Sequence, residues 1–242
     1  MLDEFKRIQK ISLYEAFFTS LVIGLAETYF VAFSLHLGVS VVESGLLSTL
    51  PLLFVSLAPL FFKSVYSRFY NSTWILIAAM LQVVALAGLC VLAIYQVSDS
   101  FWYLLILFSI YWFGHFSAQP SWNKWVSELI DADSSLKYFS KRTRIFQIGI
   151  LSGLVTGGIL LHSQRLSVST TIIFIGIYLV TYHLKLISVY LFYKQQTSSS
   201  VYKLEIRKKL KFLKSQKSFF KAYSLYNCSI YLSAPYVSGY LL

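Results

Sequence analysis

The chain has 242 residues, of which 57% are hydrophobic and only 13% are charged, and its mean hydropathy is +0.64. Because soluble domains carry about a quarter charged residues, this composition excludes an ordinary soluble protein and indicates a membrane protein. The formal net charge of +11 does not indicate a nucleic-acid-binding protein, since there is no soluble module whose basic face could bind DNA. We expect the charge to reflect membrane topology and attraction to anionic lipid head groups.

Seven apolar segments follow one another along the chain. Each is long enough, or nearly so, to cross a hydrocarbon core about 30 Å thick as a helix. They comprise residues 11–37, 41–62, 73–95, 101–122, 145–162, 170–193 and 219–242. The sequence therefore predicts an all-α integral membrane protein with seven spans.

The basic residues are distributed unequally between the two sides of the membrane. Of the 21 Lys and Arg residues, nineteen fall in the N-terminal segment or in and around connections on one side, with Lys221 at the start of the seventh span. The other side receives Arg165 alone, and Lys185 lies inside the sixth span. The positive-inside rule then predicts a cytoplasmic N-terminus and a C-terminus outside. Lys185 lies in the cytoplasmic third of its span, so we expect its side chain to extend to the head groups.

Composition divides the chain into three regions. Residues 1–193 form a six-span transmembrane bundle, residues 194–218 a basic cytoplasmic loop, and residues 219–242 the seventh span. Within the loop, Leu204, Ile206, Leu210 and Leu213 can share one side of a short helix with Lys and Arg opposite, which is typical of a helix lying on the cytoplasmic leaflet. The chain stops inside an apolar span, so we expect that span to begin a second half that the chain lacks.

Three acids lie near or within the apolar spans. Ser12 with Glu15, and Ser40 with Glu43, have the S-x-x-E spacing of a capping box, which predicts the starts of spans one and two. Glu27 lies well inside span one, where a charged acid costs ~2.5–3.5 kcal/mol. On a continuous helix it shares a face with Ala16, Ser20, Gly24, Val31 and Ser34. Glu27 is either a proton- or cation-coupling carboxylate or a hydrogen-bonded acid that holds span one to a neighbour.

Spans four and five carry further candidates. His115 lies past the middle of span four, and Tyr111, Trp112, Gln119 and Trp122 fall on or near its face. Such a face could line a cavity, or His115 could be a buried histidine with one hydrogen bond. Small residues repeat along span five, where a missing Cβ lets another helix approach closely. They are Gly149, Gly153, Gly157 and the adjacent Gly158.

Six spans, a long basic loop and then a further span are the order found in the major facilitator superfamily, which the chain resembles. Three degenerate motifs add to this resemblance. After span two, KSVYSRFYNS aligns with the family loop G-x-x-x-D-R-x-G-R-R and keeps only Arg68. GLVTGG at 153–158 has the spacing of the G-P-x-x-G-G element of antiporter branches, with Leu154 in place of proline. A W-x-x-W and a Y-F-x-x-R stretch join spans four and five in a bacterial branch. The matching residues here are Trp122, Trp125, Tyr138, Phe139 and Arg142.

The resemblance implies a six-helix bundle of two inverted three-helix repeats, plus the start of a second half. It implies a secondary transporter of a small solute, working by alternating access in a bacterial inner membrane. Glu27 would then couple transport or bind solute, His115 and Gln119 would line the cavity, and span five would pack at the seam between halves. Trp122 and Trp125 belong to the cytoplasmic loop motif. Arg68 and Arg142 would form a cytoplasmic gate or contact lipid.

Alternating access requires two halves that move relative to each other, and the chain supplies one of them. The resemblance therefore also implies a partner. We expect a complementary C-terminal half or a second copy, besides membrane lipids and the solute. The alternative is a non-transporting scaffold or accessory subunit, which the degenerate loop after span two favours. The sequence contains no P-loop, HExxH, CxxC, GxSxG or dinucleotide motif, so we expect no enzyme activity, cofactor or metal.

Overall fold

The computed structural model describes residues 2–61, 72–97, 100–127, 132–162 and 169–206. The chain divides into two compact units, residues 1–199 and 200–242. Of the second unit, only the end of a helix is described, to residue 206. The regular structure of the described residues is all helical, which confirms the predicted fold class.

The helices follow the predicted spans in order. The helices of the described residues are α1 (Leu2–Leu25), the 3₁₀ turn η1 (Glu27–Tyr29), α2 (Phe30–His36), α3 (Val41–Phe61), α5 (Ser72–Tyr95), α6 (Phe101–Ser127), α7 (Ala132–His162) and α8 (Thr170–Ile206). The first predicted span is therefore interrupted. The helix of the sixth predicted span, α8, continues past residue 193 into the basic segment. The rest of that segment and the predicted seventh span lie outside the described residues.

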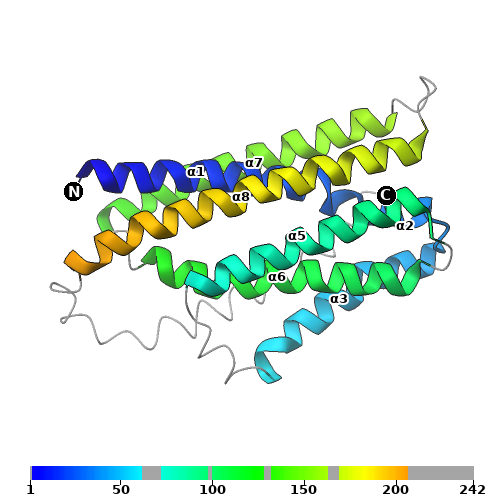
Figure 1. The fold of residues 1–242 in the computed structure, drawn as a ribbon, viewed down its shortest axis with the longest axis horizontal. Helices are drawn as coiled ribbons and strands as arrows, with labels where there is room; N and C mark the ends of the chain where they lie inside the picture. Colours follow the sequence, from blue (N-terminus) through cyan, green and yellow to red (C-terminus); the bar gives the residue numbers. More distant parts are fainter. Residues whose placement is uncertain (1, 62–71, 98–99, 128–131, 163–168, 207–242) are drawn as a thin grey trace. The chain divides into compact units, whose positions relative to one another are not determined.

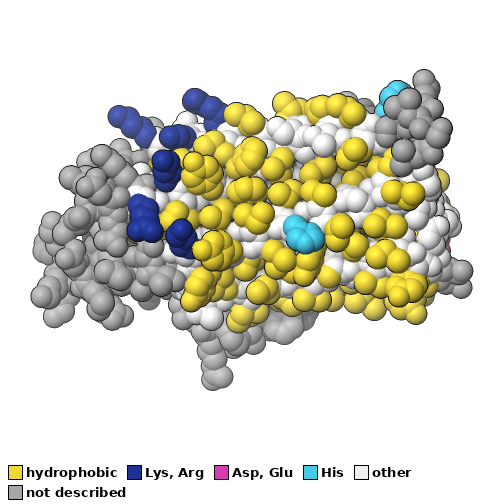
Figure 2. Space-filling view, turned by 45° about the horizontal axis from the view of Figure 1, so that its top comes forward, with side chains coloured by type: hydrophobic (Ala, Val, Ile, Leu, Met, Phe, Trp, Pro, Cys, Tyr) yellow, Lys and Arg dark blue, Asp and Glu magenta, His cyan; other side chains and the backbone are white. Residues whose placement is uncertain are grey.

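Within the described residues, five stretches are long and apolar enough to cross a membrane. They are Arg7–His36, Thr73–Tyr95, Phe101–Asn123, Lys137–His162 and Thr170–Gln196. A sixth and shorter apolar stretch, Val41–Ser56, lies in α3. Figure 2 shows apolar side chains covering most of one face, with Lys and Arg gathered at one end. An apolar surface of this extent on a helical bundle is suited to lipid.

The helices pack side by side, both neighbours in sequence and helices far apart in it. In Figure 1, α1 runs along α7, and α5 along α6, and α3 also packs on α6. Large rings fill the space between the helices. Phe30 of α2 stacks on Phe108 of α6 with ring centroids 4.3 Å apart. The Phe33 ring of α2 lies 4.7 Å from the Tyr178 ring of α8.

One of the two predicted capping boxes is confirmed. The Ser40 backbone N–H donates to Glu43 Oε2 over 3.0 Å, and the Glu43 N–H donates to Ser40 Oγ over 3.3 Å. This reciprocal pair satisfies two free amides at the start of α3. The other prediction is wrong, because α1 already begins at Leu2 and Ser12 and Glu15 lie inside it. Glu15 has another role, described below.

Candidate functional site

Glu27 lies at the break in the first span. α1 ends at Leu25 and α2 begins at Phe30, so the acid occupies the single 3₁₀ turn between them. Its side chain is half-buried, and Tyr111 Oη of α6 donates a hydrogen bond to Glu27 Oε1 over 2.6 Å. Because α1 ends at Leu25, Glu27 does not continue the α-helical periodicity of the residues before it. Glu27 therefore contacts α6.

The small residues that precede Glu27 contact a different helix. Ser20 and Gly24 lie against α7, where they meet Gly149 and Gly153. The sequence had placed Glu27 on the same face as these residues. That expectation is wrong because it assumed an unbroken helix through residue 27. The break separates a packing face on α1 from a polar contact at η1.

Arg142 joins three helices at the end of the bundle where α1 and α7 begin. Its Nη2 lies 2.8 Å from Glu15 Oε2, forming an ion pair between α7 and α1. Its Nη1 donates to the Ser12 carbonyl oxygen over 2.6 Å and to Ser12 Oγ over 2.8 Å. The guanidinium also lies over the Trp122 ring of α6, 4.4 Å from its centroid. A planar guanidinium suits this combination, because it donates in a fork and stacks on an aromatic face.

The Glu15 carboxylate is held from several sides. Thr19 Oγ1 donates to Glu15 Oε1 over 2.8 Å, and Ser188 Oγ of α8 donates to the same oxygen over 3.4 Å. The two hydroxyls lie 2.7 Å apart. Next to them, Tyr138 Oη lies 2.5 Å from Ser12 Oγ. A buried carboxylate is tolerated when it is paired and hydrogen-bonded, and Glu15 meets both conditions.

Lys185 is buried in the bundle, so its predicted extension to the head groups is wrong. The residue is 4% exposed and interacts electrostatically with Glu15 and Glu27. The physical reason is the orientation of α8, whose interior face carries a polar stripe. Its members are Tyr178, Thr181, Lys185 and Ser188, all buried. Their spacing by three or four residues was the signal in the sequence that could have located the lysine.

His115 and Gln119 follow Tyr111 on α6 at one-turn intervals, and both are half-buried. It is the Tyr111 hydroxyl that reaches Glu27. The His115 ring lies 5.9 Å from the Trp112 ring and 5.3 Å from the Phe116 ring, and the residue interacts electrostatically with Lys185. Sequence reasoning had placed Tyr111 on this face without giving it a partner.

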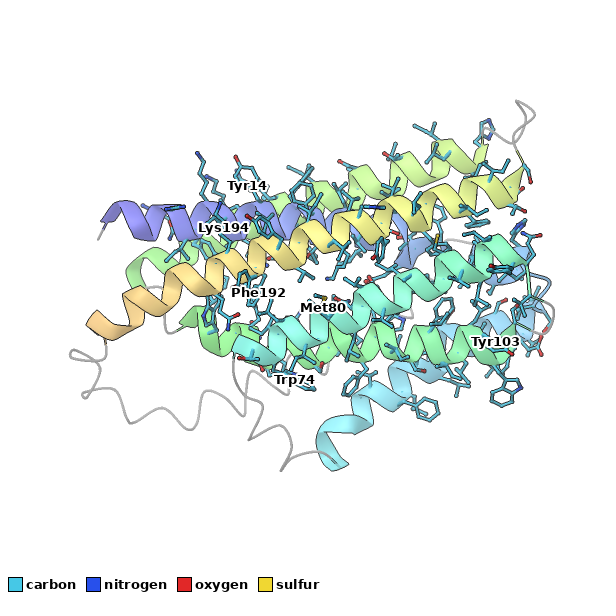
Figure 3. The ribbon with its side chains drawn as sticks, viewed as in Figure 1. Tyr14, Trp74, Met80, Tyr103, Phe192 and Lys194 are labelled. Carbon is cyan, nitrogen blue, oxygen red and sulfur yellow. The ribbon has the colours of Figure 1, made fainter. Side chains whose placement is uncertain are left out.

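The residues expected to join spans four and five lie inside helices. Trp122 and Trp125 belong to α6, whereas Tyr138, Phe139 and Arg142 belong to α7. Both helices extend beyond their apolar segments, which shortens the connection to residues 128–131. Trp125 is buried, and its ring lies 5.5 Å from the Phe192 ring, which points from α8 toward α6 in Figure 3. Arg68 lies outside the described residues.

Gly153 marks the point where α7 crosses α1. A Cβ built on Gly153 would lie 2.8 Å from the Leu21 carbonyl oxygen and 2.9 Å from the Gly24 Cα. A Cβ on Gly24 would in turn meet the backbone of α7 at Ile150 and Gly153. Backbone atoms cannot move aside as a side-chain end can. The contact therefore requires glycine in both helices.

The other glycines of α7 extend the same contact. A side chain at Gly149 would collide with Ser20, and one at Gly157 with the Tyr29 ring. Gly158 lies near the hydroxyl of that tyrosine, 3.3 Å from where its Cβ would be. The glycine row thus lies against α1 and η1 of the same unit. Its neighbour in the described residues is the broken first span.

A comparison with protein families finds a match to the model described as Major Facilitator Superfamily, over residues 16–241. No curated protein and no solved structure matches the chain.

Proposed function

The chain belongs to the major facilitator superfamily, and we propose that it is a secondary transporter that moves a small solute across the membrane by alternating access. The observation that carries the proposal is Glu27, an acid at a helix break inside a membrane span, hydrogen-bonded by Tyr111. Broken helices form the solute and ion sites of many secondary transporters. An ionisable residue within a span is costly and is by default a candidate for function.

In this proposal Glu27 couples solute movement to a proton or cation. Its half-buried carboxylate can exchange a proton, while the Tyr111 hydroxyl donates to the ionised form. His115 and Gln119 line the solute path, because they continue the Tyr111 face of α6 by successive turns. Arg142, with Trp122, holds the ends of α1, α6 and α7 together on the cytoplasmic side.

Alternating access requires a second body against which this bundle can rock. We propose that a complementary half or a second copy supplies it. The alternative, a non-transporting scaffold, was based on the loop after the second span. That loop lies outside the described residues, and no described contact favours the alternative.

We further propose that the protein lies in a bacterial inner membrane with its N-terminus in the cytoplasm. Exposed basic residues support this orientation, since they lie near the starts of α1 and α7 and late in α8. They are Arg7, Lys10, Lys137, Lys141, Arg144 and Lys194.

The orientation predicts the result of reporter fusions. Alkaline phosphatase fused after Gln96, just past the end of α5, should be active because that point faces the outside. The same enzyme fused after Ser127, at the end of α6, should be inactive, and a fluorescent protein there should fluoresce. The reverse pattern at these two positions would contradict the proposed orientation.

Transport itself is tested with the full chain in liposomes. A mixture of small metabolites is supplied outside, an inward proton gradient is imposed, and the contents are identified by mass spectrometry. We expect at least one solute to exceed its outside concentration, and a protonophore should abolish the excess. Protein-free liposomes are the control. Equal contents with and without the chain would exclude transport by copies of this chain alone, and equal contents again after the complementary half is added would contradict the proposal.

A further inference from the structure

Lys185 is a buried cation in the part of α8 that spans the membrane. Its neighbour one turn along, Ser188, donates to Glu15 of α1, so this face of α8 is directed at the broken first span. A buried ammonium group is costly unless an opposite charge compensates it. An opposite charge nearby would stabilise its ammonium form.

On the same face of α8, Ser188 contacts Glu15 of α1 and the Tyr178 ring lies 4.7 Å from the Phe33 ring of α2. Lys185 lies between these two contacts, so it faces the stretch of the first span whose acids are Glu15 and Glu27. Glu15 is already paired with the Arg142 guanidinium at 2.8 Å and accepts hydroxyl hydrogen bonds as well. That pair is neutral as a whole. Glu27 instead accepts a hydrogen bond from a neutral donor, Tyr111, which leaves its charge uncompensated.

The remaining titratable groups on this interior face supply no negative charge at neutral pH. On α6 they are Tyr111 and His115, and on α8 the Tyr178 hydroxyl is buried two turns before Lys185. Tyrosine is neutral near pH 7, and histidine adds either no charge or a positive one. Among the described groups, the lysine and Glu27 therefore remain to compensate each other.

We propose that Lys185 is the counter-charge of Glu27, and thus a positioning residue for the coupling acid. The Arg142–Glu15 pair stays neutral, so the interior has no net charge when Glu27 is ionised. When Glu27 binds a proton, the interior gains one positive charge, carried by Lys185. The role in coupling rests on the proposed function. The charge pairing is a property of the fold.

A double-mutant cycle on the full chain in detergent micelles tests the pairing. Lys185→Met should lower the thermal unfolding midpoint by roughly 10 °C, because it leaves Glu27 without a counter-charge inside the membrane span. Adding Glu27→Gln should restore at least half of that loss. Adding Glu15→Gln instead should restore nothing, since it leaves Arg142 without its carboxylate. Lys185→Arg, which keeps the charge, should stay near the wild-type midpoint.

The proposal would be overturned if adding Glu15→Gln restored the midpoint of Lys185→Met. It would also be overturned if the midpoint losses of Lys185→Met and Glu27→Gln were additive in the double variant. If Lys185→Met does not accumulate, the amount of full-length protein in the membrane replaces the midpoint. Recovery with Glu27→Gln then supports the pairing, and no recovery overturns it. The cycle needs no transport assay. Its failure is therefore distinguishable from a failure of the proposed function, which the liposome experiment measures.

Discussion

Glutamine in place of Glu27 is expected to abolish gradient-driven accumulation of the solute in liposomes and to leave solute exchange largely intact. The amide keeps the shape of the side chain and can still accept the hydrogen bond from Tyr111. It cannot bind and release a proton, so the gradient no longer drives the cycle. Accumulation and counterflow exchange, measured in parallel on the same preparation, separate the two effects.

The matched control for Glu27→Gln is Glu43→Gln. Glu43 is an exposed acid whose hydrogen bonds with Ser40 cap the start of α3. Glutamine also serves at this position of a capping box, so Glu43→Gln should keep the cap and leave accumulation unchanged. If the Glu27→Gln variant accumulates solute as the wild type does, with the same dependence on pH, Glu27 has a structural role and does not couple transport. Loss of expression would point to helix packing.

Leucine in place of Gly153 is expected to cause a large loss of stability. The new side chain would meet the Leu21 carbonyl oxygen and the Gly24 backbone, so α1 and α7 would have to move apart. Overpacking commonly lowers the free energy of unfolding by ~1–3 kcal/mol. Because the new side chain would meet backbone atoms, we expect a loss at or above the upper end of that range. Gly153→Ala should already lower the thermal midpoint measured in detergent, because even its Cβ has no room.

Gly176 of α8 provides the matched control. It is exposed, and a Cβ there would meet nothing within 4 Å. Gly176→Ala should therefore keep or raise the midpoint, since alanine favours a helix over glycine by about 1 kcal/mol. Equal losses for Gly153→Leu and Gly176→Leu would show that close packing at Gly153 does not decide the effect.

The amino-acid sequence by itself determined the membrane class, the order of the first six apolar segments and the capping box at Ser40. These features depend on residues that are close together along the chain. Hydropathy is summed over one segment, and a capping box joins residues three apart. The sequence also located the glycine row on α7, because its period is a property of one helix.

The partners across helices were decided only by the tertiary structure. The S-x-x-E spacing at Ser12 is equally compatible with a helix interior, and Glu15 is in fact paired with Arg142, 127 positions further along. The break at η1 directs Glu27 to α6, and the orientation of α8 buries Lys185. A local pattern cannot show which face of one helix meets another. That choice follows from packing all the helices together, where a buried charge is tolerated only beside a compensating one.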